Sequence, residues 1–124
     1  MSEQPKNGKA LRVLSLVMGL VFLASGVAKF DLVEQIVQNF ARWGYPVWFR
    51  YFVGVAELAA GVAILLPSTR FYGAMLATGL MVGGVGTHLR AGEVAESTPA
   101  LVLGVLCAIL AWNYRPAFLR PARA

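Results

Sequence analysis

The chain has 124 residues, of which 58% are hydrophobic and 14% are charged, and its formal net charge is +5. Soluble domains carry roughly a quarter charged residues, so this composition excludes an ordinary soluble protein and leaves no length for a separate soluble domain. The basic residues cluster beside apolar runs, which is typical of membrane topology signals and headgroup contacts, so we expect a lipid bilayer and no nucleic acid as partner.

The apolar runs predict an all-α integral membrane four-helix bundle. They lie at about residues 11–28, 49–66, 71–88 and 100–112. Runs of about 16 to 18 residues cover roughly 24 to 27 Å at the helical rise, slightly less than a typical bilayer core. The first run has the basic start of a signal peptide, but three further runs follow it, so we expect a retained helix.

The rest of the chain divides into two tails and two kinds of link. We expect residues 1–10 to be a disordered cytoplasmic terminus, residues 11–114 to be the transmembrane domain and residues 115–124 to be a basic cytoplasmic tail. The short link at 67–70 predicts an antiparallel helical hairpin.

The link at residues 31–43 alternates apolar and polar residues with helical spacing. It predicts a short amphipathic helix at the membrane surface between the first and second spans, with Ile36 and Phe40 facing the membrane or bundle. Asp31 is expected to be its N-cap. An ordinary packed loop is the alternative.

The asymmetry of lysine and arginine predicts the orientation in the membrane. With both termini on one side, that side collects Lys6, Lys9, Arg12, Arg70, Arg115, Arg120 and Arg123. The other side collects Lys29, Arg42, Arg50 and Arg90. The excess places both termini in the cytoplasm of a multi-pass inner-membrane protein.

Glu57 is an acid inside an otherwise apolar span. An ionised carboxylate in hydrocarbon is costly, so such residues usually face protein, pair with a partner or stay protonated. Gly54 and Gly61 share its helical face and allow another helix to come close. We therefore expect Glu57 to face the bundle interior as a ligand or proton site, with a structural helix–helix tether as the alternative.

Lys29 and His88 end the first and third spans in the same half of the predicted bundle. Gly26 and Gly84 lie on their respective helical faces, so the three polar residues could converge on one closely packed cleft. The alternatives are that Lys29 snorkels to headgroups and that His88 is an interfacial hydrogen-bonding residue.

Small residues mark the third span as a central helix. Gly79 and Gly83 form a small-x-x-x-small pair and are expected to serve helix packing. Cys107 is the single cysteine, which excludes an intrachain disulfide, and we expect it to be a buried apolar residue. The spans hold no second carboxylate and no paired-cysteine or His-x-x-His pattern, so we expect no metal site and no intrinsic cofactor.

Three stretches resemble the DoxX family, in particular its small DoxX-like branch. They read FLASGVAKF at 22–30, GVAELAAG at 54–61 and THLRAGE at 87–93. The resemblance implies a bacterial or archaeal four-helix membrane bundle, and it maps the family's glutamate onto Glu57 and its lysine onto Lys29; His88 is carried over as well. Some relatives resemble membrane subunits of quinone-linked or oxidative-stress systems, and others resemble assembly factors.

These features leave three functions open. The first is a membrane accessory component of a redox-linked system, in which a cleft near Glu57 binds a quinone and an oxidoreductase partner supplies electrons. The second is a non-enzymatic scaffold or assembly factor for membrane proteins. The third is a small transporter subunit, which four short spans would support only through a homo-oligomer. We expect the chain not to be an enzyme on its own.

Overall fold

The computed structural model describes residues 8–120, and every regular element in that range is helical. The long helices are α1 (Gly8–Ala28), α3 (Val47–Leu65), α4 (Arg70–Arg90) and α5 (Thr98–Asn113). The short elements are α2 (Glu34–Arg42) and the 3-10 turns η1 (Ala95–Ser97) and η2 (Ala117–Leu119). Residues 8–10, expected to precede the first helix, belong to α1, whereas residues 1–7 and 121–124 of the two expected tails lie outside the described range.

Three segments are long and apolar enough to cross a membrane: Gly8–Ala28, Val47–Leu65 and Ala95–Asn113. The sequence had predicted a fourth span at 71–88. The corresponding helix α4 has 21 residues, as many as α1, but its glycines and its polar ends lower its hydropathy. Membrane crossing by length and composition is thus supported for three helices in the described range.

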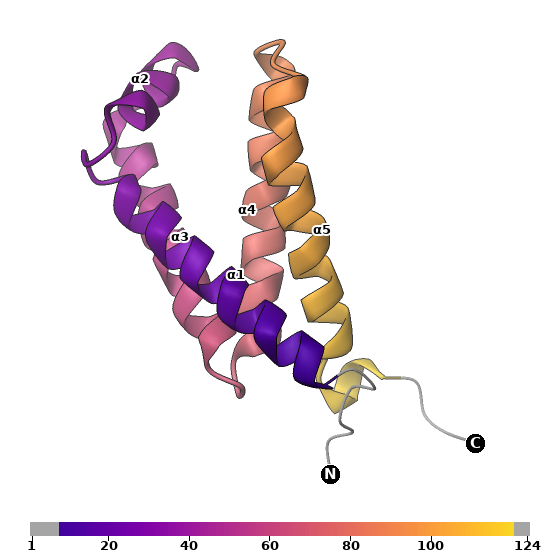
Figure 1. The fold of residues 1–124 in the computed structure, drawn as a ribbon. Coiled ribbons are helices and arrows are strands. Elements are labelled where there is room, and N and C mark those ends of the chain that lie inside the picture. Colours follow the sequence, from indigo (N-terminus) through magenta and orange to yellow (C-terminus); the bar gives the residue numbers. More distant parts are fainter. Residues whose placement is uncertain (1–7, 121–124) are drawn as a thin grey trace.

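The long helices form two packed pairs. Helix α1 lies along α3, and α4 lies along α5, while α3 also contacts α4 (Figure 1). The pairs diverge toward the end that carries α2 and come together at the end where α1 begins and α5 finishes (Figure 1). The turn between α3 and α4 reverses the chain within a few residues, as the short link predicted.

Backbone contact between α1 and α3 depends on glycines. A Cβ added to Gly26 would lie 2.8 Å from the carbonyl oxygen of Gly54, and one added to Gly61 would lie 2.8 Å from that of Gly19. Real Cβ atoms essentially never approach that closely, so these positions hold the helices together at a distance that side chains would prevent.

The glycines of α4 behave differently from the expectation. A Cβ on Gly79 or Gly83 would meet nothing within 4 Å, so this pair does not pack against a helix of the described chain. Gly84 makes only an ordinary contact, 3.5 Å from the Cβ of Ala100 on α5. The glycine of α4 that does allow close packing is Gly73, whose Cβ would lie 2.6 Å from the backbone nitrogen of Ile64 on α3. The spacing identified the motif, but the divergence of the pairs leaves Gly79 and Gly83 beside open space.

The interior is small and apolar, and the exterior is apolar as well. Fully buried core residues include Phe22, Ile64, Ala74 and Leu110. Large exposed apolar side chains lie on every long helix, among them Leu16, Leu20, Val55, Val62, Met75, Val82, Leu101, Val105 and Ile109. Such continuous apolar surface is typical of helices that face lipid rather than water.

Two buried arginines hold helix ends. Arg70, 5% exposed, donates from Nε to the carbonyl of Ile64 (2.7 Å) and from Nη2 to that of Leu65 (3.2 Å), at the end of α3. Arg50, 3% exposed, donates to the carbonyl of Lys29, directly after α1, over 2.6 Å. Arg70 thus gives hydrogen bonds to carbonyls that the end of α3 leaves without intrahelical partners, and Arg50 does the same for the carbonyl that directly follows α1.

Asp31 is not the N-cap of α2. The residue before that helix is Val33, which makes no side-chain capping bond. Asp31 instead has a left-handed backbone (φ 66°), and its carboxylate accepts from Arg50 Nη2 over 2.8 Å and from the hydroxyl of Tyr51. Asp31 therefore binds the charged guanidinium of Arg50 on α3 and does not cap α2. The hydrogen bond from Tyr51, followed by that from Arg50, holds the pKa of Asp31 below its ordinary value.

Candidate functional site

The end of α1 and the middle of α3 bring three polar side chains together. Ser25 and Lys29 are four residues apart and so lie one above the other on a helical face. Opposite them, Glu57 is buried on α3, 2% exposed, where the close approach of the glycines brings the two helices into contact. The structure therefore places Lys29 and Glu57 together.

The contacts within this cluster are short and directional. Lys29 Nζ lies 2.6 Å from Glu57 Oε1, which makes an ion pair. Nζ also donates to Ser25 Oγ (3.0 Å) and to the carbonyl of Ser25 (3.3 Å). The Ser25 hydroxyl donates to Glu57 Oε2 over 3.0 Å. Although Oε1 is close to Nζ, it accepts no hydrogen bond of good geometry from the described residues.

A second polar cluster lies at the end of α4. Helix α4 ends at Arg90, and Gly92, in the left-handed region (φ 76°), turns the chain back. This turn brings Glu93 against His88, whose Nδ1 is 2.8 Å from Glu93 Oε1. His88 is thus paired with Glu93, five residues along the chain, and not with Glu57.

Glu93 also binds the end of α2. Trp43 Nε1 donates to Glu93 Oε1 over 3.3 Å, and Arg42 forms an ion pair with Oε2. The Trp43 ring also meets the His88 ring edge to face, with centroids 5.2 Å apart. The hydrogen bond with His88 is the largest of the effects that hold the pKa of Glu93 below its ordinary value, so the carboxylate stays charged and connects α2 to α4.

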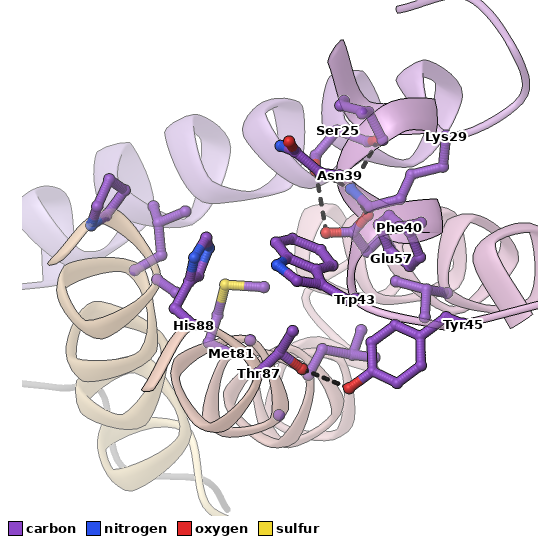
Figure 2. A pocket seen from close by; sticks show the side chains of 18 of the residues that line it. Ser25, Lys29, Asn39, Phe40, Trp43, Tyr45, Glu57, Met81, Thr87 and His88 are labelled. Carbon is purple, nitrogen blue, oxygen red and sulfur yellow. Dashed lines mark hydrogen bonds and ion pairs between the residues drawn. The ribbon is translucent and has the colours of Figure 1, made fainter. Parts of the chain in front are cut away.

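Between the two clusters is a cavity of about 480 Å³. The residues that line it come from all the long helices, from α2, from η1 and from the links that follow α1 and α2: Val21, Phe22, Ser25, Lys29, Ile36, Asn39, Phe40, Trp43, Tyr45, Phe49, Val53, Glu57, Gly79, Leu80, Met81, Gly83, Gly84, Thr87, His88, Glu96, Pro99, Ala100 and Leu103. Figure 2 shows Ser25, Lys29 and Glu57 on one side, with His88, Met81 and Thr87 on the other. Most of the lining is apolar, and its polar side chains belong to these clusters or are those of Asn39, Tyr45, Thr87 and Glu96.

Aromatic side chains bridge the diverging helix pairs at this end. The hydroxyl of Tyr45 lies 2.7 Å from Thr87 Oγ1 on α4, and Trp43 projects between the two walls in Figure 2. Ile36 and Phe40 of α2 also line the cavity, so the apolar face of the predicted amphipathic helix covers it.

The sequence identified Glu57, Lys29 and His88 but missed their immediate partners. Ser25 and Glu93 appeared only within the motifs at 22–30 and 87–93, and Arg50 was counted only in the asymmetry of basic residues. The spacing of Ser25 four residues before Lys29 was the one available signal for the first cluster. The sequence around Glu93 gives no signal of its hydrogen bond from Trp43, because that bond joins residues 50 positions apart.

Comparison with known protein families supports the family resemblance of the three motifs. Residues 13–110 match the DoxX-like family, which is most of the chain. The chain belongs to the DoxX-like family. Glu57, Lys29 and His88 all lie within the matched region.

Two proteins of Bacillus subtilis (strain 168) are among the relatives of this DoxX-like chain. One carries the name "Putative oxidoreductase CatD" and is 29% identical over 80 residues, which are 64% of this chain and 60% of that protein. The other, "Uncharacterized protein YdgD", is 24% identical over 102 residues, which are 79% of this chain and 88% of that protein. The chain thus aligns with less than two thirds of CatD. No solved structure matches significantly.

Proposed function

We propose that this DoxX-like membrane protein binds a quinone-type molecule in the cavity between its helix pairs and serves as a membrane component of a redox-linked system. The observation that carries the proposal is an apolar cavity of about 480 Å³ whose wall holds the buried Lys29–Glu57 ion pair. Ligand pockets typically have about 300 to 1,000 Å³ and combine apolar walls with a few polar groups.

The chemistry of the lining suits such a ligand. A quinone ring needs apolar or aromatic walls and a hydrogen-bonding partner for its oxygens, and its redox change moves protons. Phe40, Trp43 and Phe49 offer aromatic surface, and the Ser25–Lys29–Glu57 cluster offers polar groups. The chain itself carries no cofactor motif, so electrons would come from a partner oxidoreductase, and the name of the relative CatD, a putative oxidoreductase, lends support to that class of system.

The proposal includes a four-helix bundle in the inner membrane with both termini in the cytoplasm. If α3 and α5 cross, α4 must cross as well, because it connects them and lies along both. Its 21 residues span about 31 Å at the helical rise, which is enough for a bilayer core. Single cysteines at Thr69 and Gly92 on a Cys107→Ala background should label from opposite sides of the membrane. Labelling of both from the same side would exclude the crossing of α4.

Ligand binding can be read from Trp43, which lines the cavity. With Trp48 and Trp112 replaced by phenylalanine, the protein in nanodiscs should show saturable quenching by a short-chain benzoquinone or its hydroquinone. A Trp43→Phe control that retains Trp48 at the exposed surface should show only the linear quenching of a molecule that partitions into lipid. Linear quenching of Trp43 as well would contradict the proposal.

The cavity can be filled from α4. Gly83 lines it and has nothing within 4 Å of its Cβ position, so Gly83→Phe should fold and abolish saturable quenching. Gly86 lies on the same helix with similar open space but does not line the cavity, so Gly86→Phe is the matched control and should bind normally.

A scaffold or assembly factor is the second candidate. The exposed Gly79 and Gly83 on α4 would let the helix of another protein approach closely. A photo-reactive residue at exposed Val82 should then crosslink a membrane protein in native membranes. Such a crosslink in a chain that shows no saturable ligand binding would favour the scaffold.

A further inference from the structure

Charge is divided unevenly between the two ends of the bundle (Figure 1). The half where the helix pairs diverge holds four basic and five acidic residues: Lys29, Arg42, Arg50, Arg90, Asp31, Glu34, Glu57, Glu93 and Glu96. The converging end, where α1 begins and α5 finishes, holds five basic residues and, within residues 8–120, no acid: Lys9, Arg12, Arg70, Arg115 and Arg120. The sequence outside this range adds Glu3, Lys6 and Arg123, so the tails do not remove the excess of positive charge.

Ion pairing separates the two ends in the same way. Every ion pair between described residues lies in the diverging half: Lys29–Glu57, Arg42–Glu93, Arg50–Asp31 and His88–Glu93. No basic residue of the converging end pairs with a carboxylate of residues 8–120. The positive charge of that end is therefore not compensated within the described chain.

Three arginines of the converging end are held together by contacts within the chain. The guanidinium of Arg70 lies over the ring of Tyr114, 5.1 Å from its centroid. Arg120 donates from Nε to the carbonyl of Arg115 (3.2 Å) and from Nη2 to that of Asn113 (3.3 Å). These bonds fold η2 back against the end of α5, so Arg115 and Arg120 lie at one place although they are five positions apart.

Two of these arginines keep hydrogen-bond donors for a ligand. Arg115 donates from Nη1 to the carbonyl of Trp112, and Arg120 donates from Nε and Nη2. Arg115 Nη2 and Arg120 Nη1 make no bond to the described residues, and the fully covered atoms without a partner are others, Glu57 Oε1 and Arg115 Nε. The free Nη groups are thus open to the exterior. Arg70 is 5% exposed, so it contributes charge and not donors.

Exposed aromatic side chains place these donors at the membrane surface. Trp112 and Phe118 are large exposed side chains, and each lies three residues from Arg115 along the chain. Aromatic residues of this kind are enriched at the headgroup level of a bilayer. Arg12 is exposed on the first turns of α1, which begins at the same end (Figure 1). Free guanidinium donors and headgroups therefore meet at one level.

We propose that the converging end binds the phosphate groups of anionic phospholipids through Arg12, Arg115 and Arg120. A guanidinium matches two phosphate oxygens with parallel N–H bonds, and the uncompensated charge attracts a headgroup of net negative charge. Phosphatidylcholine also has a phosphate, but its ammonium group is repelled by the arginines. The site thus prefers phosphatidylglycerol to phosphatidylcholine, whereas the paired charges of the diverging half give no such preference. None of the three arginines lines the cavity, so the lipid site is independent of the cavity ligand.

Two tryptophans of almost equal exposure report on the two ends. Trp112 at the converging end is 66% exposed, and Trp48, in the first turn of α3 at the diverging end, is 67% exposed. Variants that retain only one of them, with phenylalanine at the other tryptophan positions, are placed in phosphatidylcholine vesicles that contain brominated phosphatidylglycerol or brominated phosphatidylcholine. Bromine in the upper acyl chain quenches a tryptophan that it contacts, so the ratio of the two quenching curves gives the lipid preference at each end.

The expected preferences follow from the charges. One basic residue near the surface is worth about fivefold in affinity for an anionic lipid, so phosphatidylglycerol should be preferred at least about fivefold beside Trp112 and less than about twofold beside Trp48. Raising the salt concentration from about 0.05 M to about 0.5 M should reduce the preference at Trp112, because it shortens the range of the attraction.

Three variants assign the preference to the arginines. Arg12→Gln and Arg115→Gln should each lower the preference at Trp112 by about two- to fivefold. Arg90→Gln is the matched control, since Arg90 is an exposed arginine at the end of α4 in the diverging half, and it should leave that preference unchanged. Because the preference is a ratio of two lipids measured on the same variant, a change in the emission of Trp112 itself cancels.

Each contrary outcome overturns the proposal. Equal preference at Trp112 and Trp48 would show that the converging end selects no lipid. A preference at Trp112 that neither Arg12→Gln nor Arg115→Gln lowers would exclude the arginines. Inorganic phosphate should displace the lipid no more than chloride does at equal ionic strength, and stronger displacement would indicate a site for free phosphate. The comparison of the two tryptophans and its salt dependence decide the matter even if an arginine variant fails to fold.

Discussion

Replacing Lys29 by methionine should destabilise the protein strongly, because it leaves Glu57 charged and without its partner. The side chains of Lys29 and Glu57 are 12% and 3% exposed, and their charged atoms lie 2.6 Å apart. Removing one member of a buried pair costs about 3 to 5 kcal/mol, mainly because the remaining charge is uncompensated. Methionine retains the length and apolar character of the lysine stem, so the change in packing is small.

The double variant Lys29→Met/Glu57→Leu should recover most of this loss. It removes both charges together and leaves the Ser25 hydroxyl without its acceptor, a loss of about 1 kcal/mol. The coupling free energy between the two sites should therefore be at least about 2 kcal/mol. An additive result, with the double variant as unstable as the sum of the single variants, would refute the reasoning.

The free energy of unfolding can be measured by far-UV circular dichroism during reversible unfolding in mixed detergent micelles. Lys9→Met is the matched control, since Lys9 is an exposed lysine near the start of α1, the helix that Lys29 directly follows, and it should change the free energy of unfolding by less than about 0.5 kcal/mol. A loss of less than about 1 kcal/mol for Lys29→Met would indicate that the pair is solvated and that Glu57 is not buried among protein groups.

Three further measurements probe other parts of the structure. Gly26→Ala should lower the free energy of unfolding by about 1 to 3 kcal/mol, because its Cβ would lie 2.8 Å from a backbone oxygen. Gly79→Ala has open space around its Cβ and should raise the free energy of unfolding by up to about 1 kcal/mol in the same assay. The pKa of Glu93 is lowered in the folded protein, so Glu93 stabilises the fold at pH values above its ordinary pKa of 4.5, and this stabilisation is lost as the pH falls through the lowered pKa. The thermal unfolding temperature of Glu93→Gln should therefore depend less on acid pH than that of the wild type. Arg70→Lys should lose at least one of two bonds to carbonyls of α3 and about 1 to 3 kcal/mol, detectable as faster hydrogen exchange at the end of α3; unchanged exchange there would contradict a capping role.

The sequence was sufficient to predict the helices and the principal contact of the site. Apolar length and glycine spacing predicted the contact face of α1 and α3, and that face brings Lys29 to Glu57. The membership in the DoxX family, suspected from three short motifs, is confirmed by the match over residues 13–110. The helices and their contact face depend on local periodicity, which a single sequence displays directly, whereas the family was recognised from the resemblance of its motifs.

The remaining features depend on relations between distant segments. His88 was expected near Glu57, but a left-handed turn at Gly92 gives it Glu93 as a partner, and that pairing requires knowing how the loop folds back. Arg50 was counted as a surface charge, although its side chain is buried against the chain 19 to 21 residues earlier. The cavity arises because the helix pairs diverge, and periodicity within one helix says nothing about the angle between pairs.

The two buried arginines have a consequence for how the chain is made. Arg70 holds carbonyls five and six residues before it, so the end of α3 is completed almost as soon as it is synthesised. Arg50 holds the carbonyl of Lys29 from 21 residues further along, so the end of α1 stays incomplete until α3 has begun to emerge. Until then that carbonyl depends on water for its hydrogen bond, so the start of α3 completes the turn that follows α1.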